Sequence, residues 1–132
     1  QMGHDVVMSP QSHCYFDHYQ SADRGHEPKA IGGYSPLEKV YAFEPLPQEL
    51  PEAQRQHILG AQGNVWTEYM ATPAQVEYMV FPRLCALAEV VWSAKHLRNW
   101  EDFLTRLAAH DARFETLGVN YRRHYDVKAS HQ

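Results

Sequence analysis

Aromatic and carboxylate side chains lie close together at two places in the sequence. Tyr15 and Asp17 belong to the stretch CYFDHY, and Trp66 and Glu68 belong to the stretch NVWTEY. A carboxylate accepts hydrogen bonds from neighbouring hydroxyl groups, and an indole ring covers the apolar face of a pyranose ring. If the fold brings the two stretches together, these four residues predict a pocket that suits a sugar.

Two other interpretations of the same region stay open from the residues alone. Aromatic side chains near strand ends are commonly part of the core, and single carboxylates are commonly solvated. A metal site is the other alternative, with candidate ligands His13, Cys14, Asp17 and His18, and with His4 further upstream. Structural zinc sites usually show CxxC or HxxxH spacing, however, and His13 and His18 do not fit one face of a helix. We therefore expect neither a metal nor a cofactor.

Two short apolar runs precede these groups and predict buried strands. The first covers residues 5–9 and is ended by Pro10, and the second lies within residues 57–66. Residues 11–33 between them are polar and predict a long functional loop. Ligands of parallel α/β folds bind on the loops at the carboxyl ends of the strands. Both groups of side chains should therefore face the same side of a parallel sheet.

Capping signals predict where the helices begin. Ser35 should cap a helix over residues 35–43, with Glu38 completing a capping box, and residues 51–56 should form one more helical turn. A longer helical region over residues 71–93 should start at a capping box of Thr72 with Gln75. Its apolar positions repeat at helical spacing and are Val76, Met79, Val80, Leu84, Leu87 and Val91.

Pro82 should kink this region or split it in two. A last helix should begin at about Trp100, with Asn99 as its cap and Gly118 at its carboxyl end. The apolar face of this helix comprises Phe103, Leu107, Phe114 and Leu117.

The order of these elements predicts an α/β fold with parallel strands joined by right-handed crossovers. With 132 residues, the chain is long enough for one ordinary domain. Only two good strands are predicted, and a two-stranded parallel sheet buries little and leaves two open edges. We therefore expect residues 1–132 to be a single-domain part of a larger α/β protein. We expect the chain to begin in the middle of that protein, so any targeting segment would lie upstream and these residues predict no cellular compartment.

Charge and composition exclude several classes of function. The formal net charge is −4 and the isoelectric point is about 6.1, so nucleic acid is not an expected partner. The basic residues Arg122, Arg123 and His124 predict a solvated tail. No apolar run approaches roughly 18 residues, so no membrane span is predicted. Cys14 and Cys85 lack CxxC spacing and are expected to be buried thiols rather than a disulfide.

Several longer blocks of the sequence carry a family resemblance. They are VVMSP, CYFDHYQ, SPLEKVYAFEPLP, ILGAQGNVWTEYM, VEYMVFPRLCALAEVVWS and WEDFLTRLAAHDARFETLGVNYRRH. Together and in this order they resemble the C-terminal part of the catalytic domain of family-20 glycoside hydrolases, the β-N-acetylhexosaminidases. The resemblance implies a partial (β/α)8 TIM barrel: the last two βα units and the C-terminal helix, with residues 5–9 as the seventh strand.

The resemblance also implies roles for the four residues. Tyr15 matches the tyrosine that bonds the acetamido oxygen of the substrate, and Asp17 matches a carboxylate that binds sugar hydroxyls. Trp66 matches the tryptophan that packs against the non-reducing-end sugar, and Glu68 matches the glutamate that accepts from the 4- and 6-hydroxyls. Cys14 lies where some relatives carry an aromatic residue, so the nearby part of the pocket departs from the family pattern.

The chemistry implied for the parent protein is exo-acting hydrolysis of terminal N-acetyl-β-hexosaminides, with substrate-assisted, retaining catalysis. The Asp-Glu pair that supplies the general acid in this family has no counterpart in the sequence, so the isolated chain is expected to be inactive. Its expected partners are glycans ending in N-acetylglucosamine or N-acetylgalactosamine, and further copies of itself. The family implies a periplasmic or extracellular location. The alternative is a stand-alone carbohydrate-binding or interaction domain.

Overall fold

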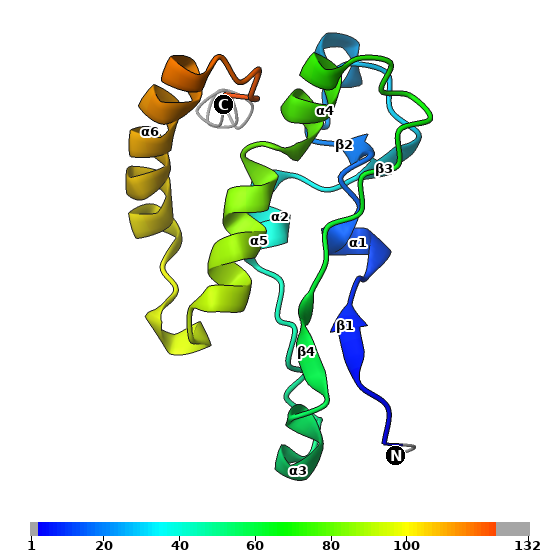
Figure 1. Cartoon of the computed structure of the whole chain (residues 1–132), viewed down its shortest axis with the longest axis vertical. Coiled ribbons are helices and arrows are strands. Elements are labelled where there is room, and N and C mark those ends of the chain that lie inside the picture. Colours follow the sequence, from blue (N-terminus) through cyan, green and yellow to red (C-terminus); the bar gives the residue numbers. More distant parts are fainter. Residues whose placement is uncertain (1–2, 124–132) are drawn as a thin grey trace.

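Short parallel strands lie beside a layer of longer helices (Figure 1). The structure is a computed structural model and describes residues 3–123. The strands are β1 (Val6–Met8), β2 (His18–Tyr19), β3 (Gly32–Tyr34) and β4 (Ile58–Ala61). The helices are α1 (Gln11–Cys14), α2 (Leu37–Tyr41), α3 (Glu52–Arg55), α4 (Pro73–Val80), α5 (Arg83–Trp92) and α6 (Trp100–Leu117), and two 3₁₀ turns cover Arg24–His26 and Lys95–Leu97.

The two predicted strands form a parallel pair, but the prediction that they are buried is wrong: Val6, Val7 and Leu59 are exposed, because a two-stranded sheet has few elements to cover its faces. β1 and β4 lie side by side, with Met8 opposite Ala61 (Figure 1). The pairing continues past their carboxyl ends as a parallel bridge between Tyr15 and Asn64. The amide of Asn64 donates to the carbonyl of Cys14 over 2.7 Å, which ties the exits of the two strands together. The predicted α/β arrangement with parallel strands is therefore confirmed.

The stretch predicted as one long loop, residues 11–33, contains regular structure. It holds the short helix α1 and the strand β2, and β2 pairs in parallel with β3. In this second pair His18 lies opposite Gly32, and Tyr19 lies opposite Tyr34. Elements of two to four residues are too short to show a hydrophobic period, so the sequence pattern could not reveal them.

The predicted cap at Ser35 is wrong. The helix α2 begins at Leu37, no side chain caps it, and Pro36 occupies the cap position. The Ser35 hydroxyl instead donates to the carbonyl oxygen of Ser12 over 3.1 Å, and it lies 3.3 Å from Nδ1 of His18. Ser35 is fully buried. Its hydroxyl therefore bonds to α1 rather than to its own helix.

The later helices begin and end as predicted. The capping box of Thr72 and Gln75 is present at the start of α4, and α4 and α5 are separate helices divided at Pro82. The side chain of Asn99 accepts a hydrogen bond from the backbone of Asp102 at the start of α6. Gly118 ends α6 in the left-handed conformation, with φ of 69°. No helix within residues 3–123 is both long and apolar enough to cross a membrane.

The predicted apolar face of the α4–α5 region is only partly buried. Met79 and Leu87 are in the core, but Leu84 and Val91 are exposed. The break at Pro82 ends one helical period and starts another, so the two helices do not share a continuous apolar face. α5 buries Arg83, Ala86, Leu87 and Val90. On α6 the predicted face is buried except at Leu117, which is 75% exposed near the helix end.

The main core lies between α2, α5, α6 and the exit of β1. Its buried members are Cys14, Phe16, Leu37, Val40, Tyr41, Phe43, Ala86, Leu87, Val90, Phe103 and Leu107. Cys14 and Cys85 are both free, as predicted, with Cys14 buried and Cys85 partly buried. Burial raises the pKa of each thiol to about 11. Neither cysteine is therefore a nucleophile at neutral pH.

The predicted solvated tail is wrong for Arg122, which belongs to a buried ion pair. Its Nε donates to Oε1 of Glu27 over 2.8 Å, and the two side chains are only 11% and 4% exposed. The hydroxyl of Tyr78 also donates to Oε2 of Glu27, over 3.3 Å. Arg123 is exposed, and His124 lies outside the described residues. The segment after α6 is therefore joined to the loop that follows β2.

Candidate functional site

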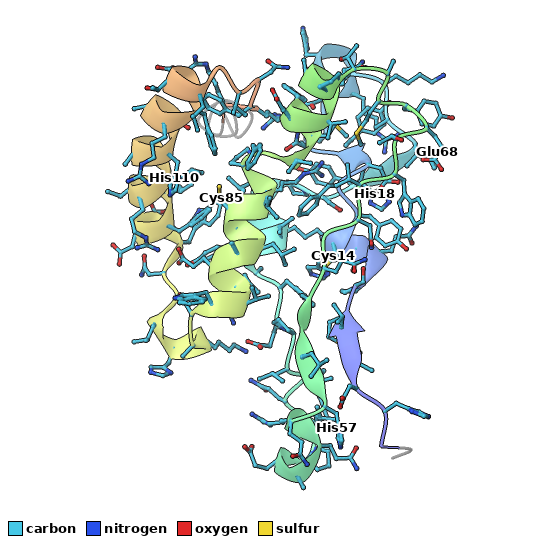
Figure 2. The ribbon with its side chains drawn as sticks, viewed as in Figure 1. Cys14, His18, His57, Glu68, Cys85 and His110 are labelled. Carbon is cyan, nitrogen blue, oxygen red and sulfur yellow. The ribbon has the colours of Figure 1, made fainter. Side chains whose placement is uncertain are left out.

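Tyr15, Asp17, Trp66 and Glu68 line one open groove of about 540 Å³. Its other lining residues are Gln11, His18, Ile31, Gly32 and Gly33. The groove lies beyond the carboxyl ends of β1 and β4, and Figure 2 shows His18 and Glu68 at that end of the molecule, far from His57 near the start of β4. The fold thus brings together the two stretches that the sequence singled out.

The two sides of the groove differ in burial. Tyr15 and Asp17 follow α1, and the Asp17 side of the groove is anchored in the core by Phe16, which is 1% exposed. Trp66 and Glu68 lie in the segment after β4, and both are exposed, Trp66 at 53%. The turn that carries Glu68 is closed by a hydrogen bond from the amide of Met70 to the carbonyl of Thr67. One wall is therefore fixed and polar, and the other is an open aromatic surface.

Asp17 has an oxygen that the protein itself leaves unused. The residue is 6% exposed, and its buried Oδ1 has no hydrogen-bond partner among residues 3–123. A buried carboxylate oxygen without a donor is costly, so such atoms usually point to a missing ligand or water. Because Asp17 lines the groove, a ligand hydroxyl placed there would meet its carboxylate group.

His18 lines the groove, although the sequence indicates it only as a candidate metal ligand. Its ring is buried, lies 5.8 Å from the Tyr15 ring between centroids, and is 3.3 Å from the Ser35 hydroxyl at Nδ1. His13 instead stacks on Phe43. In the part of the chain that the structure describes, no three His, Cys, Asp or Glu side chains converge as metal ligands. The two histidines are thus held apart by separate packing partners.

Both histidines make stability depend on pH. Burial lowers the pKa of His18 below its ordinary value of 6.5; the cations of Arg83 and Lys39 lower it further, while Asp17 opposes them. Burial and Lys39 also lower the pKa of His13. The unfolded chain therefore binds more protons than the folded chain at about pH 5–6, so the free energy of unfolding should rise from pH 5 to pH 7.

Urea unfolding at pH 5, 6 and 7 would check this expectation. The variant carrying both His13→Asn and His18→Asn should show a flatter rise than the unchanged chain. His96→Asn, at an exposed position in a 3₁₀ turn, is the control. An unchanged slope in the double variant would contradict the assignment to these two rings.

Gly33 leaves room for the His18 ring. A Cβ atom at Gly33 would lie 2.5 Å from Nδ1 of His18, and φ at Gly33 is 62°. Gly118 has a similar φ of 69° but open space around it, so it is a matched control for backbone strain alone. Each substitution with alanine should cost about 1–2 kcal/mol through strain. Gly33→Ala should cost about 1 kcal/mol more than Gly118→Ala through overpacking, as measured by urea unfolding. Equal losses would show that the His18 ring moves aside freely.

Arg83 is a residue of this region that the sequence did not reveal. It is completely buried, and its guanidinium donates to the carbonyl oxygens of Phe16 and His18, which flank Asp17. Burial lowers the pKa of Arg83 to about 9, while the charges of Glu27 and Asp17 favour its protonated form. The PR dipeptide after an apolar run was the available signal, but arginine is a surface residue in most proteins.

Residues 1–95 match the family model of glycosyl hydrolase family 20, catalytic domain. The chain is 47% identical over 121 residues to a β-hexosaminidase of Porphyromonas gingivalis, an alignment that covers 91% of this chain and 15% of that protein. It is also 33% identical over 123 residues to a β-N-acetylhexosaminidase of Cellulomonas fimi, with 92% of this chain and 24% of the relative covered. The chain therefore spans less than a quarter of the length of either relative.

A solved structure of similar shape contains a bound sugar. It is the exo-β-N-acetylglucosaminidase of Vibrio harveyi in complex with N-acetylglucosamine, with a TM-score of 0.77 and 37% identity. The match covers 92% of this chain and 19% of that one. The fold of residues 3–123 is thus shared with part of a much longer enzyme.

Proposed function

Since the chain belongs to the catalytic-domain family of glycosyl hydrolase family 20, we propose that it forms the sugar-holding part of a β-N-acetylhexosaminidase. In this proposal residues 1–132 are the C-terminal segment of a (β/α)8 barrel, and β1 and β4 are its last two strands. The parallel β1–β4 pair and the groove at its carboxyl end support this placement. The substrates are glycans that end in N-acetylglucosamine or N-acetylgalactosamine.

The observation that carries the proposal is the buried, unused oxygen of Asp17 in a groove faced by Trp66. A sugar hydroxyl would donate to the carboxylate of Asp17 while the indole ring covers the apolar face of the pyranose. The hydroxyl of Tyr15 would bond the acetamido oxygen, and the exposed carboxylate of Glu68 would accept from the 4- and 6-hydroxyls. All four groups hold the substrate, and none of them transfers the catalytic proton.

The proposed chemistry is substrate-assisted hydrolysis with retention. The acetamido oxygen attacks the anomeric carbon, and the bond to the leaving oxygen breaks as that oxygen takes a proton from a general acid. Water then opens the oxazolinium intermediate and restores the acetamido group. The general acid belongs to an Asp-Glu pair outside this sequence, and Tyr15 contributes by holding the nucleophile in place.

An activity assay of the isolated chain tests the proposal that these residues bind the substrate but do not supply the general acid. The chain should not hydrolyse an aryl N-acetyl-β-glucosaminide. Hydrolysis that disappears in the Glu68→Gln variant would contradict the proposal, because Glu68 would then act in the chemistry rather than in binding.

A titration with N-acetylglucosamine, followed by NMR at the indole N–H of Trp66, tests the groove itself. Weak binding that is lost in Asp17→Asn, with no response to cyclohexanol at the same concentration, supports an incomplete sugar pocket. Tight and specific binding by the isolated chain would instead favour a stand-alone carbohydrate-binding domain. Chemical-shift changes confined to residues far from Trp66 would contradict sugar binding in the groove.

We also propose that the isolated chain self-associates. Both edges of the β1–β4 pair are unpaired in the structure of residues 3–123, and large apolar side chains are exposed on the strands, at the end of α5 and in the 3₁₀ turn that follows it. The exposed residues include Val6, Val7, Leu59, Trp92 and Leu97, and Trp92 is 91% exposed. Open strand edges and apolar patches favour pairing with another chain. Sedimentation at tens of micromolar should show dimers or larger species, and a clean monomer would contradict this.

A further inference from the structure

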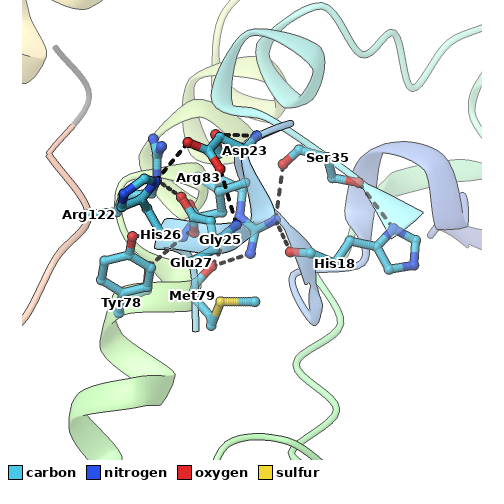
Figure 3. A network of polar contacts seen from close by, with 12 residues as sticks. His18, Asp23, Gly25, His26, Glu27, Ser35, Tyr78, Met79, Arg83 and Arg122 are labelled. Atoms are coloured by element: carbon cyan, nitrogen blue, oxygen red, sulfur yellow. Dashed lines mark hydrogen bonds and ion pairs between the residues drawn. The ribbon is translucent and has the colours of Figure 1, made fainter. Parts of the chain in front are cut away.

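The side chain of Arg83 uses its whole set of donors inside the protein. Nε and Nη2 donate to the carbonyl oxygen of Met79 over 3.0 and 2.5 Å, and Nη2 also donates to Phe16 over 2.5 Å. Nη1 donates to His18 and to Ser35, over 3.0 Å each. Arg83 and these four carbonyl groups form what we call the Arg83 network, and Figure 3 shows its contacts with His18, Ser35 and Met79.

The network joins three separate segments of the chain. Met79 is in the last turn of α4, Ser35 precedes α2, and Phe16 and His18 lie on either side of Asp17. The Phe16–Asp17 and His18–Tyr19 peptide groups, which lie on either side of Asp17, are therefore both held by one rigid, planar side chain. A guanidinium group can reach several carbonyls at once because its five N–H donors are fixed in a plane.

The same side chain also connects the two walls of the groove. The guanidinium lies 5.0 Å from the centroid of the Phe16 ring. That ring packs against Gly63, where a Cβ atom would lie 2.7 Å from Cε2 of Phe16. Gly63 precedes Asn64, whose carbonyl accepts from the amide of Phe16 over 2.8 Å, and Trp66 follows two residues later.

We propose that Arg83 is a positioning residue that sets the backbone around Asp17 and thereby aims its carboxylate into the groove. Arg83 does not line the groove, so it acts on a bound ligand only through Asp17 and its neighbours. The consequence for sugar binding rests on the proposed function, whereas the ordering of the backbone does not. A general stabilising role would instead weaken the whole fold evenly.

Hydrogen exchange in the 132-residue chain separates these two roles. In Arg83→Lys, which keeps the charge but has three donors on one nitrogen, the amides of Phe16, His18 and Ser35 should exchange at least tenfold faster. The amides in the middle of α6 should keep their rates. The matched control is Arg106→Lys, because Arg106 is exposed and bonds a single carboxylate, that of Glu89. Equal acceleration at all sites, or none, would overturn the proposal.

The unchanged chain provides a measurement if Arg83→Lys fails to fold. ¹⁵N NMR of the guanidinium group should show separate, slowly exchanging Nη protons for Arg83, because rotation about its Cζ–N bonds is blocked by the four carbonyls. A single averaged signal, like that of an exposed arginine, would overturn the network as an ordering device.

The link to the sugar is tested in the longer protein that carries this chain. Arg83→Lys should lower kcat/KM on an aryl N-acetyl-β-glucosaminide about as much as Asp17→Asn does. The variant with both substitutions should have a kcat/KM only slightly lower than that of either single variant. Additive losses would overturn positioning through Asp17. A protein with no activity on any N-acetylhexosaminide would overturn the proposed function, and the exchange experiment would still decide the role of Arg83 in ordering the backbone.

Discussion

Replacing Glu27 with alanine should lower the free energy of unfolding by about 3–5 kcal/mol, the range for removing one partner of a buried ion pair. Glu27 is the carboxylate that faces Arg122 over 2.8 Å and accepts from Tyr78 over 3.3 Å. Without it, the guanidinium of Arg122, whose side chain is 11% exposed, stays in the interior with its charge uncompensated. Urea unfolding at one fixed protein concentration would measure the loss.

A variant that removes both charges would show how the loss arises. The variant carrying both Glu27→Met and Arg122→Met should be more stable than Glu27→Ala alone, because no unpaired charge remains. Glu52→Ala is the matched control, since Glu52 pairs with Arg55 on the surface over 3.2 Å and such pairs contribute about 0–1 kcal/mol. A loss at Glu27 no larger than that at Glu52 would contradict the burial of the pair.

In the β-N-acetylhexosaminidase that we propose as the parent of this chain, replacing Asp17 with asparagine should lower kcat/KM roughly 10- to 100-fold on an N-acetyl-β-glucosaminide. A hydrogen bond to a buried charged acceptor contributes about 1.5–3 kcal/mol, which corresponds to that range of rates. Stability should change by less than about 1 kcal/mol, because the lost attraction between Asp17 and Arg83 is offset by relief of an unpartnered buried oxygen.

Glu68→Gln is the comparison for this effect. Glu68 lines the same groove but is exposed, so its hydrogen bonds to a ligand compete with water and its replacement should cost only a few-fold. Steady-state kinetics and urea unfolding of both variants would be measured together. A large drop in the stability of Asp17→Asn, with proportionate loss of activity, would show that Asp17 is a structural residue instead.

The parts of the fold that could be predicted from the sequence depend on neighbouring residues. The capping box of Thr72 and Gln75, the cap at Asn99 and the end at Gly118 each involve groups within four positions of one another. Pro82 acts on its own helix in the same local way. These features form wherever the local sequence allows them, because they need no distant partner.

The features that escaped prediction are decided by distant partners. Ser35 failed as a cap because its hydroxyl finds the carbonyl of Ser12 and the ring of His18 in the folded chain. Arg83 and Arg122 are buried cations whose acceptors are up to 67 and 95 residues away in sequence. A charged residue in a sequence normally predicts exposure, so only the three-dimensional arrangement of acceptors reveals these two.

The candidate site could be predicted in part from the sequence, and in part it depends on distant partners. Tyr15, Asp17, Trp66 and Glu68 were expected on one side of a parallel sheet, and they line one groove. The rule that ligands bind at the carboxyl ends of parallel strands was sufficient for that. The burial of Asp17 and the inclusion of His18 follow from packing around Phe16 and Gly33, which no local pattern encodes. The roles of the four residues stay a prediction.

The ion pair between Glu27 and Arg122 bears on the order in which the chain folds. It joins residues 95 positions apart, whereas β2 and β3 are joined across a much shorter loop. Closing a long loop costs more conformational entropy and is delayed until other contacts hold its ends near each other. We therefore expect the contact between Arg122 and the loop after β2 to form late, once α6 has docked. Breaking this ion pair should mainly raise the unfolding rate constant and leave the folding rate constant almost unchanged.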